Sequence, residues 1–147
     1  MAIFNGTDLI LKVSPSDGGT DAKLMHSQSV TLDVSTETID ITTKDSSGRQ
    51  EVIAGLTSFS LSSDGLMDFN PSVAVAADTE FDELFVQGYT NRTAVTFTFT
   101  LATTATGDYT FSGSGIITAL SISAGVEDAP TYSVSIQGTG ALTKNDI

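Results

Sequence analysis

The chain has 147 residues, no cysteine, and a formal net charge of −12 from 18 acidic and 6 basic side chains. This length is enough for one hydrophobic core, so we expect a single domain over residues 1–147. The lack of cysteine excludes disulfides and thiolate metal sites. The shortage of basic residues argues against a protein that grips nucleic acid through its phosphates.

Serine and threonine make up roughly a quarter of the residues, and threonine suits the solvent face of a β-sheet. No apolar stretch approaches the roughly 20 residues that a bilayer-spanning helix needs. The beginning of the sequence also lacks the basic and apolar regions of a signal peptide. We therefore expect a β-rich protein without membrane insertion.

The first half of the sequence shows three strand-like stretches. Residues 7–13 are apolar enough for a strand, and residues 29–43 alternate in the manner of one long bent strand or two short ones. Residues 56–65 alternate again and end at Asp64-Gly65, a dipeptide typical of turns. The connection at 44–55 is too long and too charged for a tight hairpin turn.

One helix is predicted, at about residues 78–87. Asp78 or Thr79 can cap its start, acids follow in the first turn, and Gly88 comes after its end. Phe81, Leu84 and Phe85 fall on one stripe of such a helix. We expect that stripe to pack on a sheet.

The second half of the sequence has the strongest strand pattern. Val95, Phe97, Phe99 and Leu101 alternate with threonines, which predicts a half-buried strand. In the next strand the apolar residues change from odd positions, at Tyr109 and Phe111, to even positions, at Ile116, Leu120 and Ile122. A glycine-bearing bulge at Gly113 and Gly115 accounts for such a change of face.

A third strand is predicted within residues 131–143, where Tyr132, Val134 and Ile136 alternate with polar residues. Together these patterns predict a mainly β fold. We expect antiparallel strands in a β-sandwich or flattened barrel, with one docked α-helix and a long early inter-strand loop.

Candidate chemistry is sparse, and no enzyme is predicted. His26 is the only histidine and lies in a polar stretch, where an ordinary surface residue is the favoured interpretation over a general base. Asp64 and Asp68 lack the dense alternation of a calcium loop. We expect no cofactor and no metal.

Two separated segments resemble the major tail tube proteins of long-tailed (siphovirus-type) bacteriophages. The first is ETIDITTKDSSGRQEVIAGLTSFSLSSDGL at 37–66, with its Thr-Lys-Asp-Ser block, glycine turn and Ser-rich strand. The second is FSGSGIITALSISAGVEDAPTYSVSIQGTGAL at 111–142, which ends in Gly-Thr-Gly. The chain departs from the family at Arg49-Gln50, at the tip of the loop, where an aromatic residue is expected.

The resemblance implies a structural protein of the virion tail, assembled in the cytoplasm of the host bacterium. Such proteins form hexameric rings that stack into the hollow tail tube, through which phage DNA passes into the host. The implied partners are further copies of the chain, a tape-measure protein in the lumen and proteins at the tail ends. DNA is implied only as a transient, non-specific passenger.

In this family a long loop between two early strands contacts neighbouring subunits or the next ring, and residues 44–55 match it. We expect Gly48 to make the turn, and Lys44 and Arg49 to meet acidic surface on adjacent copies. The sequence does not assign the lumen-facing residues. The candidate contact residues are Lys44, Asp45, Ser46, Ser47, Gly48, Arg49, Gln50 and Glu51.

Two other functions stay open at this point. The first is the inner tube of a contractile tail or of a phage-derived injection device, which shares the tube architecture. The second, of a different class, is an Ig-like adhesive or carbohydrate-binding module. That module predicts clustered exposed aromatic residues, whereas the sequence has no tryptophan and 3 tyrosines.

Overall fold

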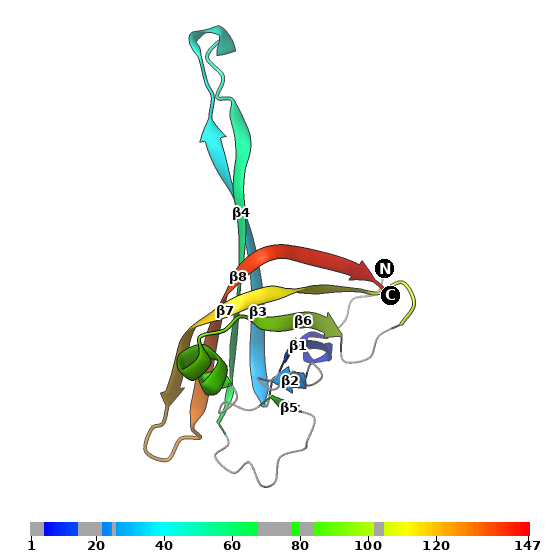
Figure 1. Ribbon diagram of the computed structural model, residues 1–147, viewed down its shortest axis with the longest axis vertical. Helices are drawn as coiled ribbons and strands as arrows, with labels where there is room; N and C mark the ends of the chain where they lie inside the picture. The colour runs from blue at the N-terminus through cyan, green and yellow to red at the C-terminus, as the bar shows by residue number, and fades with distance from the viewer. Residues whose placement is uncertain (1–4, 15–21, 25, 68–77, 80–83, 102–104) are drawn as a thin grey trace.

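The computed structural model describes residues 5–14, 22–24, 26–67, 78–79, 84–101 and 105–147, and this part of the chain is mainly β (Figure 1). Six longer strands pair antiparallel in the order β3-β4-β8-β7-β6-β1, followed by the short strands β2 and β5, which are parallel to each other. The prediction of a mainly antiparallel β protein is confirmed. The strands are β1 (Leu9–Val13), β2 (Ala22–Leu24), β3 (Ser27–Asp40), β4 (Val52–Leu66), β5 (Asp78–Thr79), β6 (Val95–Leu101), β7 (Tyr109–Ser123) and β8 (Thr131–Asp146).

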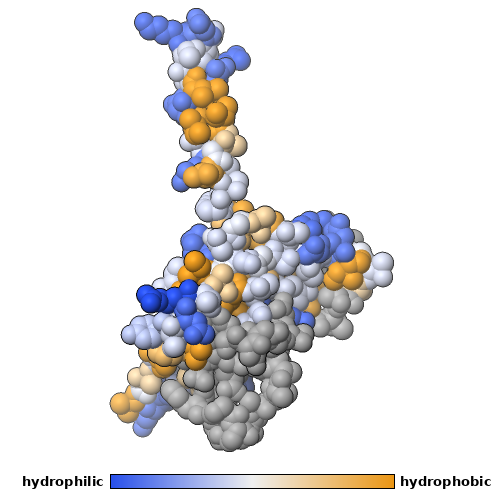
Figure 2. Space-filling view, viewed as in Figure 1, coloured by the Kyte–Doolittle hydropathy of each residue, from blue (hydrophilic) through white to orange (hydrophobic). Residues whose placement is uncertain are grey.

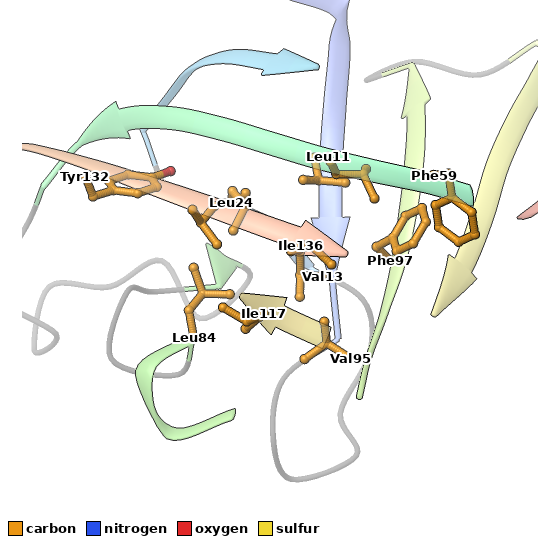
Figure 3. Packing of buried hydrophobic residues seen from close by; sticks show 12 residues of the cluster. Leu11, Val13, Leu24, Phe59, Leu84, Val95, Phe97, Ile117, Tyr132 and Ile136 are labelled. Carbon is orange, nitrogen blue, oxygen red and sulfur yellow. The ribbon is translucent and has the colours of Figure 1, made fainter. Parts of the chain in front are cut away.

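The sheet curls around one hydrophobic core (Figure 3). β1 and β3 are separated by four strands in the sheet order, yet they come into contact, and both line one cleft. Inside the curl, the rings of Phe59 and Phe97 pack with centroids 5.7 Å apart. The buried cluster is Leu11, Val13, Leu24, Phe59, Leu61, Leu84, Val95, Phe97, Ile117, Tyr132, Val134 and Ile136.

The alternation predicted for β6 is mostly found. Val95, Phe97 and Leu101 are buried and Phe99 is half-buried. Thr100, expected to face outward, is buried, and its hydroxyl donates a hydrogen bond to the Leu101 carbonyl oxygen at 3.4 Å. This bond reduces the cost of burying a polar group, which makes the exception tolerable.

Residues 29–43 were expected to form one long bent strand or two short strands, and β3 is one long strand. Its pairing with β4 shifts register between Ser27 and Ser29 and between Thr36 and Thr38. The predicted turn at Asp64-Gly65 is wrong, because β4 continues through it to Leu66. A Cβ atom on Gly65 would lie 2.5 Å from the His26 carbonyl oxygen. The glycine thus permits close packing of neighbouring backbones rather than a turn.

The helix predicted at about 78–87 is not found in that form. Asp78 and Thr79 form β5, residues 80–83 lie outside the described residues, and residues 84–85 lead into the π-helical segment η4 (Val86–Asn91). Gly88, expected to follow the helix, lies within η4, where a Cβ atom would lie 3.0 Å from Ile117. Tertiary packing against β7 thus continues the helical segment through a residue that usually ends helices.

β7 pairs irregularly with β8 at two places. The register shifts between Ser112 and Ser114, beside Gly113, and again between Ile117 and Ala119. Gly113 and Gly115 keep regular pairing with Phe97 and Val95 of β6. As a result Ile117 is buried, whereas Ile116, expected on the buried face, is 47% exposed.

Candidate assembly surfaces

The β3–β4 hairpin extends far beyond the rest of the sheet (Figure 1). β4 pairs with β8 only from Ser60 to Leu66, while its pairing with β3 continues out to Val52. Residues 35–58 therefore form a two-stranded projection, which we call the arm. A two-stranded ribbon in water is marginally stable by itself, so an arm of this length favours contact with another surface.

Apolar side chains cover the middle of the arm, as Figure 2 shows. Ile39 pairs directly with Ile53, so these two side chains share a face. Leu56 lies beside the register shift of the arm and is 77% exposed. Exposed apolar clusters of this kind mark interaction sites. We call these exposed aliphatic residues the arm patch; they are Ile39, Ile41, Val52, Ile53 and Leu56, of which Val52, paired with Asp40, lies on the face opposite to Ile39 and Ile53.

The tip of the arm is an ordered turn. It contains the short 3-10 helix η2 (Lys44–Ser46), after which Ser47 and Gly48 adopt positive φ angles of 53° and 75°. The Ser46 hydroxyl accepts a hydrogen bond from the Thr43 amide at 3.1 Å and donates one to Glu51 Oε2 at 2.8 Å. The Arg49 amide donates to the Ser46 carbonyl oxygen at 3.0 Å. Serine 46 is thus the buried centre of the turn.

Hydrogen bonds also fix the base of this turn. The Glu51 amide donates to Thr42 Oγ1 at 2.9 Å, and the Thr42 amide donates to Asp40 Oδ1 at 2.8 Å. The Thr42 bonds, from side chain and backbone, hold the pKa of the Asp40 carboxyl below its usual value. Hydrogen bonds among these polar residues therefore fix the conformation of the tip. The side chains of Lys44 and Arg49 take no part in these bonds.

Lys44 and Arg49 are exposed, and within the described residues neither makes an ion pair. Asp45, Ser47, Gln50 and Glu51 are exposed beside them, whereas Ser46 is buried. The structure therefore brings all eight candidate contact residues of the sequence to the end of the arm. With Asp45 and Glu51 beside them, the two cations make the tip locally neutral on a chain of net charge −12.

A second apolar surface lies between η4 and the end of β7. Beyond Gly115, β7 has no strand partner on its β6 side among the described residues, and η4 packs there instead. Phe85 and Tyr89 stack with ring centroids 5.2 Å apart. We call the resulting hollow the η4–β7 groove; its apolar lining is Phe85, Tyr89, Ile117, Ala119, Leu120 and Ile122.

Sequence reasoning missed both apolar surfaces. The sequence pattern predicts Ile39 and Ile41 only as strand residues, because alternation does not tell whether a buried face has a partner within the same chain. Phe85 was placed on a helix stripe, but its role in a groove depends on β7, which is distant in sequence. For the arm, a signal was present in the sequence: the five aliphatic residues of the arm patch flank the charged tip at short spacing.

Nothing in the described residues assembles a catalytic or metal site. His26 is exposed at a turn with φ 46°, and its carbonyl oxygen accepts a hydrogen bond from the Leu66 amide at 3.1 Å. No three His, Asp or Glu side chains of the described residues are grouped to hold a metal ion. Asp68 lies outside the described residues. None of the described helices is long and apolar enough to cross a membrane.

The family model for phage tail tube proteins matches residues 3–144, which is almost the whole chain. The chain belongs to the phage tail tube protein family. It is therefore a structural component of a virion tail and not an enzyme. This family assignment was predicted from the sequence, and it leaves no support for an Ig-like adhesive module.

Solved structures resemble this tail tube protein along its length. The tail of an empty gene transfer agent (GTA) particle, refined with C6 symmetry, has a TM-score of 0.78 at 20% identity and covers 97% of this chain and 99% of the other. The SPP1 tail tube has a TM-score of 0.74 at 16% identity, covering 99% and 80%. The baseplate of the anti-feeding prophage (AFP), 6-fold symmetrised, reaches 0.66 at 10% identity, covering 99% and 96%. No match was found among the curated proteins.

Proposed function

We propose that this tail tube protein forms hexameric rings, which stack into the hollow tube through which phage DNA passes into the host. The observation that carries the proposal is the agreement with the C6-symmetric GTA tail over 97% of this chain and 99% of that chain. A match of such extent leaves no large part of either fold unaccounted for. The arm supports the same proposal, because its exposed apolar side chains are not covered within the described part of the subunit.

A tube needs two kinds of contact, one that closes a ring and one that joins successive rings. Both are head-to-tail contacts, since different surfaces of identical subunits meet. Ring closure ends when the rotation is complete, whereas stacking continues as a filament. The arm projects along the longest axis of the molecule (Figure 1), which suits a contact that reaches outside the subunit's own ring.

We further infer that the curled sheet acts as a flattened barrel and that residues 1–147 assemble as one unit with the arm as its extension. Contact between β1 and β3 supports the barrel. The core on the inside of the curl leaves the outward faces, rich in serine and threonine, for neighbours and solvent. A docked helix is supported only by the residues from Leu84 to Asn91.

The charge of the chain supports the role of a conduit. Six copies would carry a net charge of −72, from −12 each. An acidic, hydroxyl-rich tube does not neutralise phosphates, so it holds passing DNA weakly. A tape-measure protein in the lumen and proteins at the tail ends are the further partners that such a tube requires.

One observation favours a second candidate, the inner tube of a contractile tail or of a phage-derived injection device. The AFP baseplate structure matches 99% of this chain and 96% of that chain with a TM-score of 0.66. The tube subunit has the same task in both machines. They differ in whether a sheath surrounds the tube, so co-purification of a sheath protein with the tails distinguishes them.

Electron microscopy of the purified protein tests the proposal. We expect hollow rings or tubes of uniform width, with six-fold symmetry in end-on class averages. Mass photometry of the smallest assembled species should give six copies of the chain. A protein that stays monomeric at high concentration, with and without crowding agents, would contradict the proposed function.

A further inference from the structure

The η4–β7 groove exposes more apolar surface than an isolated subunit needs. Tyr89 is 73% exposed although its ring is held against Phe85 by stacking. Ile122, farther along β7, is 47% exposed, while Ile117, which also lines the groove, is buried. A preformed apolar hollow with aromatic walls is the kind of surface that receives aliphatic anchors from a partner.

The arm patch has the shape and chemistry of such an anchor. It is a narrow ribbon of aliphatic side chains, and Leu56 is its most exposed member. Figure 1 places the tip of the arm and the β7–β8 turn at opposite ends of the molecule. A contact between these ends joins each copy to the next in the same direction, and it continues without closing upon itself.

Opposite charges lie beside the two surfaces, and at the tip of the arm the two cations are accompanied by the acids Asp45 and Glu51. Lys44 and Arg49 lie beyond the arm patch, and Glu127 and Asp128 lie in the exposed β7–β8 turn beyond the groove. Arg49 is four residues from Ile53, about 13 Å of extended chain, and Glu127 is five residues from Ile122, at most about 17 Å. When the apolar parts meet, the cations and the acids can therefore meet as well.

We propose that the arm of one copy docks in the η4–β7 groove of a copy in the adjacent ring, with Leu56 and Ile53 in the groove. Lys44 and Arg49 then face Glu127 and Asp128 of the receiving copy. This inference rests on the proposed function, because it requires stacked rings. It adds the receiving surface, which the family assignment does not give.

Disulfide trapping tests the contact directly, because the natural chain has no cysteine. We combine Leu56→Cys with Ile122→Cys in one chain, assemble tubes, oxidise them, and separate the chains without reductant. The proposal predicts a ladder of linked chains. The control combines Leu56→Cys with Thr106→Cys, an exposed residue outside the groove, and should remain monomeric on the gel.

The outcomes separate this inference from the proposed function. Tubes with no ladder would overturn the groove as the arm's site, leaving it to another tail protein or to solvent, while ring stacking stands. A ladder in both pairs would show unspecific collision and would also overturn it. If the first pair prevents assembly, Ile53→Cys with Ala119→Cys repeats the test, since Ala119 also lines the groove.

Charge exchange gives an independent test. Lys44→Glu with Arg49→Glu should raise the concentration needed for tube formation roughly tenfold or more, because two attractions become repulsions. Lys144→Glu, at an exposed lysine of β8 that does not line the groove, should change this concentration less than Arg49→Glu alone. Adding Glu127→Lys and Asp128→Lys to the arm double variant should restore assembly.

Restoration must be specific to the proposed acids. Asp8→Lys with Asp33→Lys changes the net charge by the same amount at other exposed positions. Equal rescue by this pair would indicate a general charge effect and would overturn the proposed pairing. Failure of the Glu127 and Asp128 reversal to rescue would overturn it too.

Discussion

Glycine 138 fixes the point at which the arm leaves the sheet. The last pair of β4 with β8 is Ser60 with Gln137, and a Cβ atom on Gly138 would lie 2.2 Å from the Phe59 ring. Beyond this pair, Gln137 Nε2 donates to the Phe59 carbonyl oxygen at 3.1 Å. The side chain of Gln137 thus supplies a hydrogen bond to the Phe59 carbonyl oxygen at the point where β4 and β8 separate. The lack of a side chain at Gly138 leaves room for the Phe59 ring at the base of the arm.

Gly138→Ala should therefore destabilise the isolated subunit. The added methyl group has no space beside Phe59, and overpacking of this kind costs about 1–3 kcal/mol of unfolding free energy. Urea denaturation of the unassembled protein measures the loss. Gly6→Ala is the control, since nothing lies within 4 Å of its Cβ position; equal stability of the two variants would show that Phe59 moves aside freely.

Tyr132 is a residue for which the structure predicts a pH dependence of the unfolding free energy. Burial raises the pKa of its phenol to about 12, against a smaller lowering effect of the hydrogen bond with Ser63. The folded protein keeps this proton at a pH where the unfolded chain has lost it. Its contribution is fully present below about pH 10 and disappears as the pH rises to about 12.

We expect the unfolding free energy to fall by about 2–3 kcal/mol over that interval, at 1.36 kcal/mol per pKa unit. Denaturant unfolding at several alkaline pH values measures it, and ultraviolet absorbance of tyrosinate follows the titration. Tyr132→Phe removes the titrating group, so its stability should decline less steeply. The same slope in both proteins would assign the alkaline loss to other groups.

At the scale of secondary-structure elements, the same two strands bury their apolar residues in the core and expose them in the arm. Apolar residues occur along the whole of β3 and β4, interrupted by the register shift between Thr36 and Thr38, but only the part outside the arm has a sheet and core to cover its apolar face. Leu61, outside the arm, is buried, whereas Leu56, in the arm, is 77% exposed. The stability of the subunit therefore depends on the first, and we propose that assembly depends on the second.

Ile53→Ser with Leu56→Ser should separate these two properties. Because both side chains are exposed, the unfolding free energy of the unassembled subunit should change by about 0.5 kcal/mol or less per site. The concentration required for tube formation, followed by light scattering, should rise. Ile136→Ala is the contrasting variant: it removes a core side chain and should cost about 2–5 kcal/mol of unfolding free energy. If the serine variant formed tubes at the same concentration as the wild-type protein, a docking role for the arm would be contradicted.

At the scale of the whole molecule, each subunit must associate with copies that carry the same charge of −12. Repulsion between them acts over about 30 Å at 0.01 M salt but over about 8 Å at 0.15 M. Apolar contacts, such as those proposed for the arm patch, do not weaken on screening. The negative charge therefore opposes association of the subunits, although it favours weak binding of DNA inside the tube. Salt reduces the repulsion between subunits.

Tube formation should accordingly become easier as ionic strength rises from about 0.01 M to about 0.15 M. Light scattering against protein concentration at each salt level gives the threshold for assembly. Arg49→Glu should show the steeper salt dependence, because it adds repulsion at the arm. A threshold that rises with salt in the wild-type protein would indicate that specific ion pairs outweigh the net repulsion.

Local pattern was sufficient where a residue's environment follows from its neighbours in sequence. Alternation placed Phe97 and Ile136 in the core, and the Thr-Lys-Asp-Ser block identified the family. Gly65 shows where this reasoning fails. A glycine after aspartate suggests a turn locally, whereas the crowding by His26 and Tyr132 arises from strands that only the fold brings together.

The sequence by itself determined that this is a mainly β, acidic tail tube protein with a charged loop carrying Lys44 and Arg49, because composition, period and family motif are properties of the linear chain. The tertiary structure alone decided that this loop is the tip of an apolar arm and that a groove of matching chemistry lies between η4 and β7. The physical reason is that exposure depends on which strands end early. β8 turns away from β4 at Gly138, and β6 leaves β7 beyond Gly115; each departure uncovers apolar side chains that sequence alternation predicts as buried.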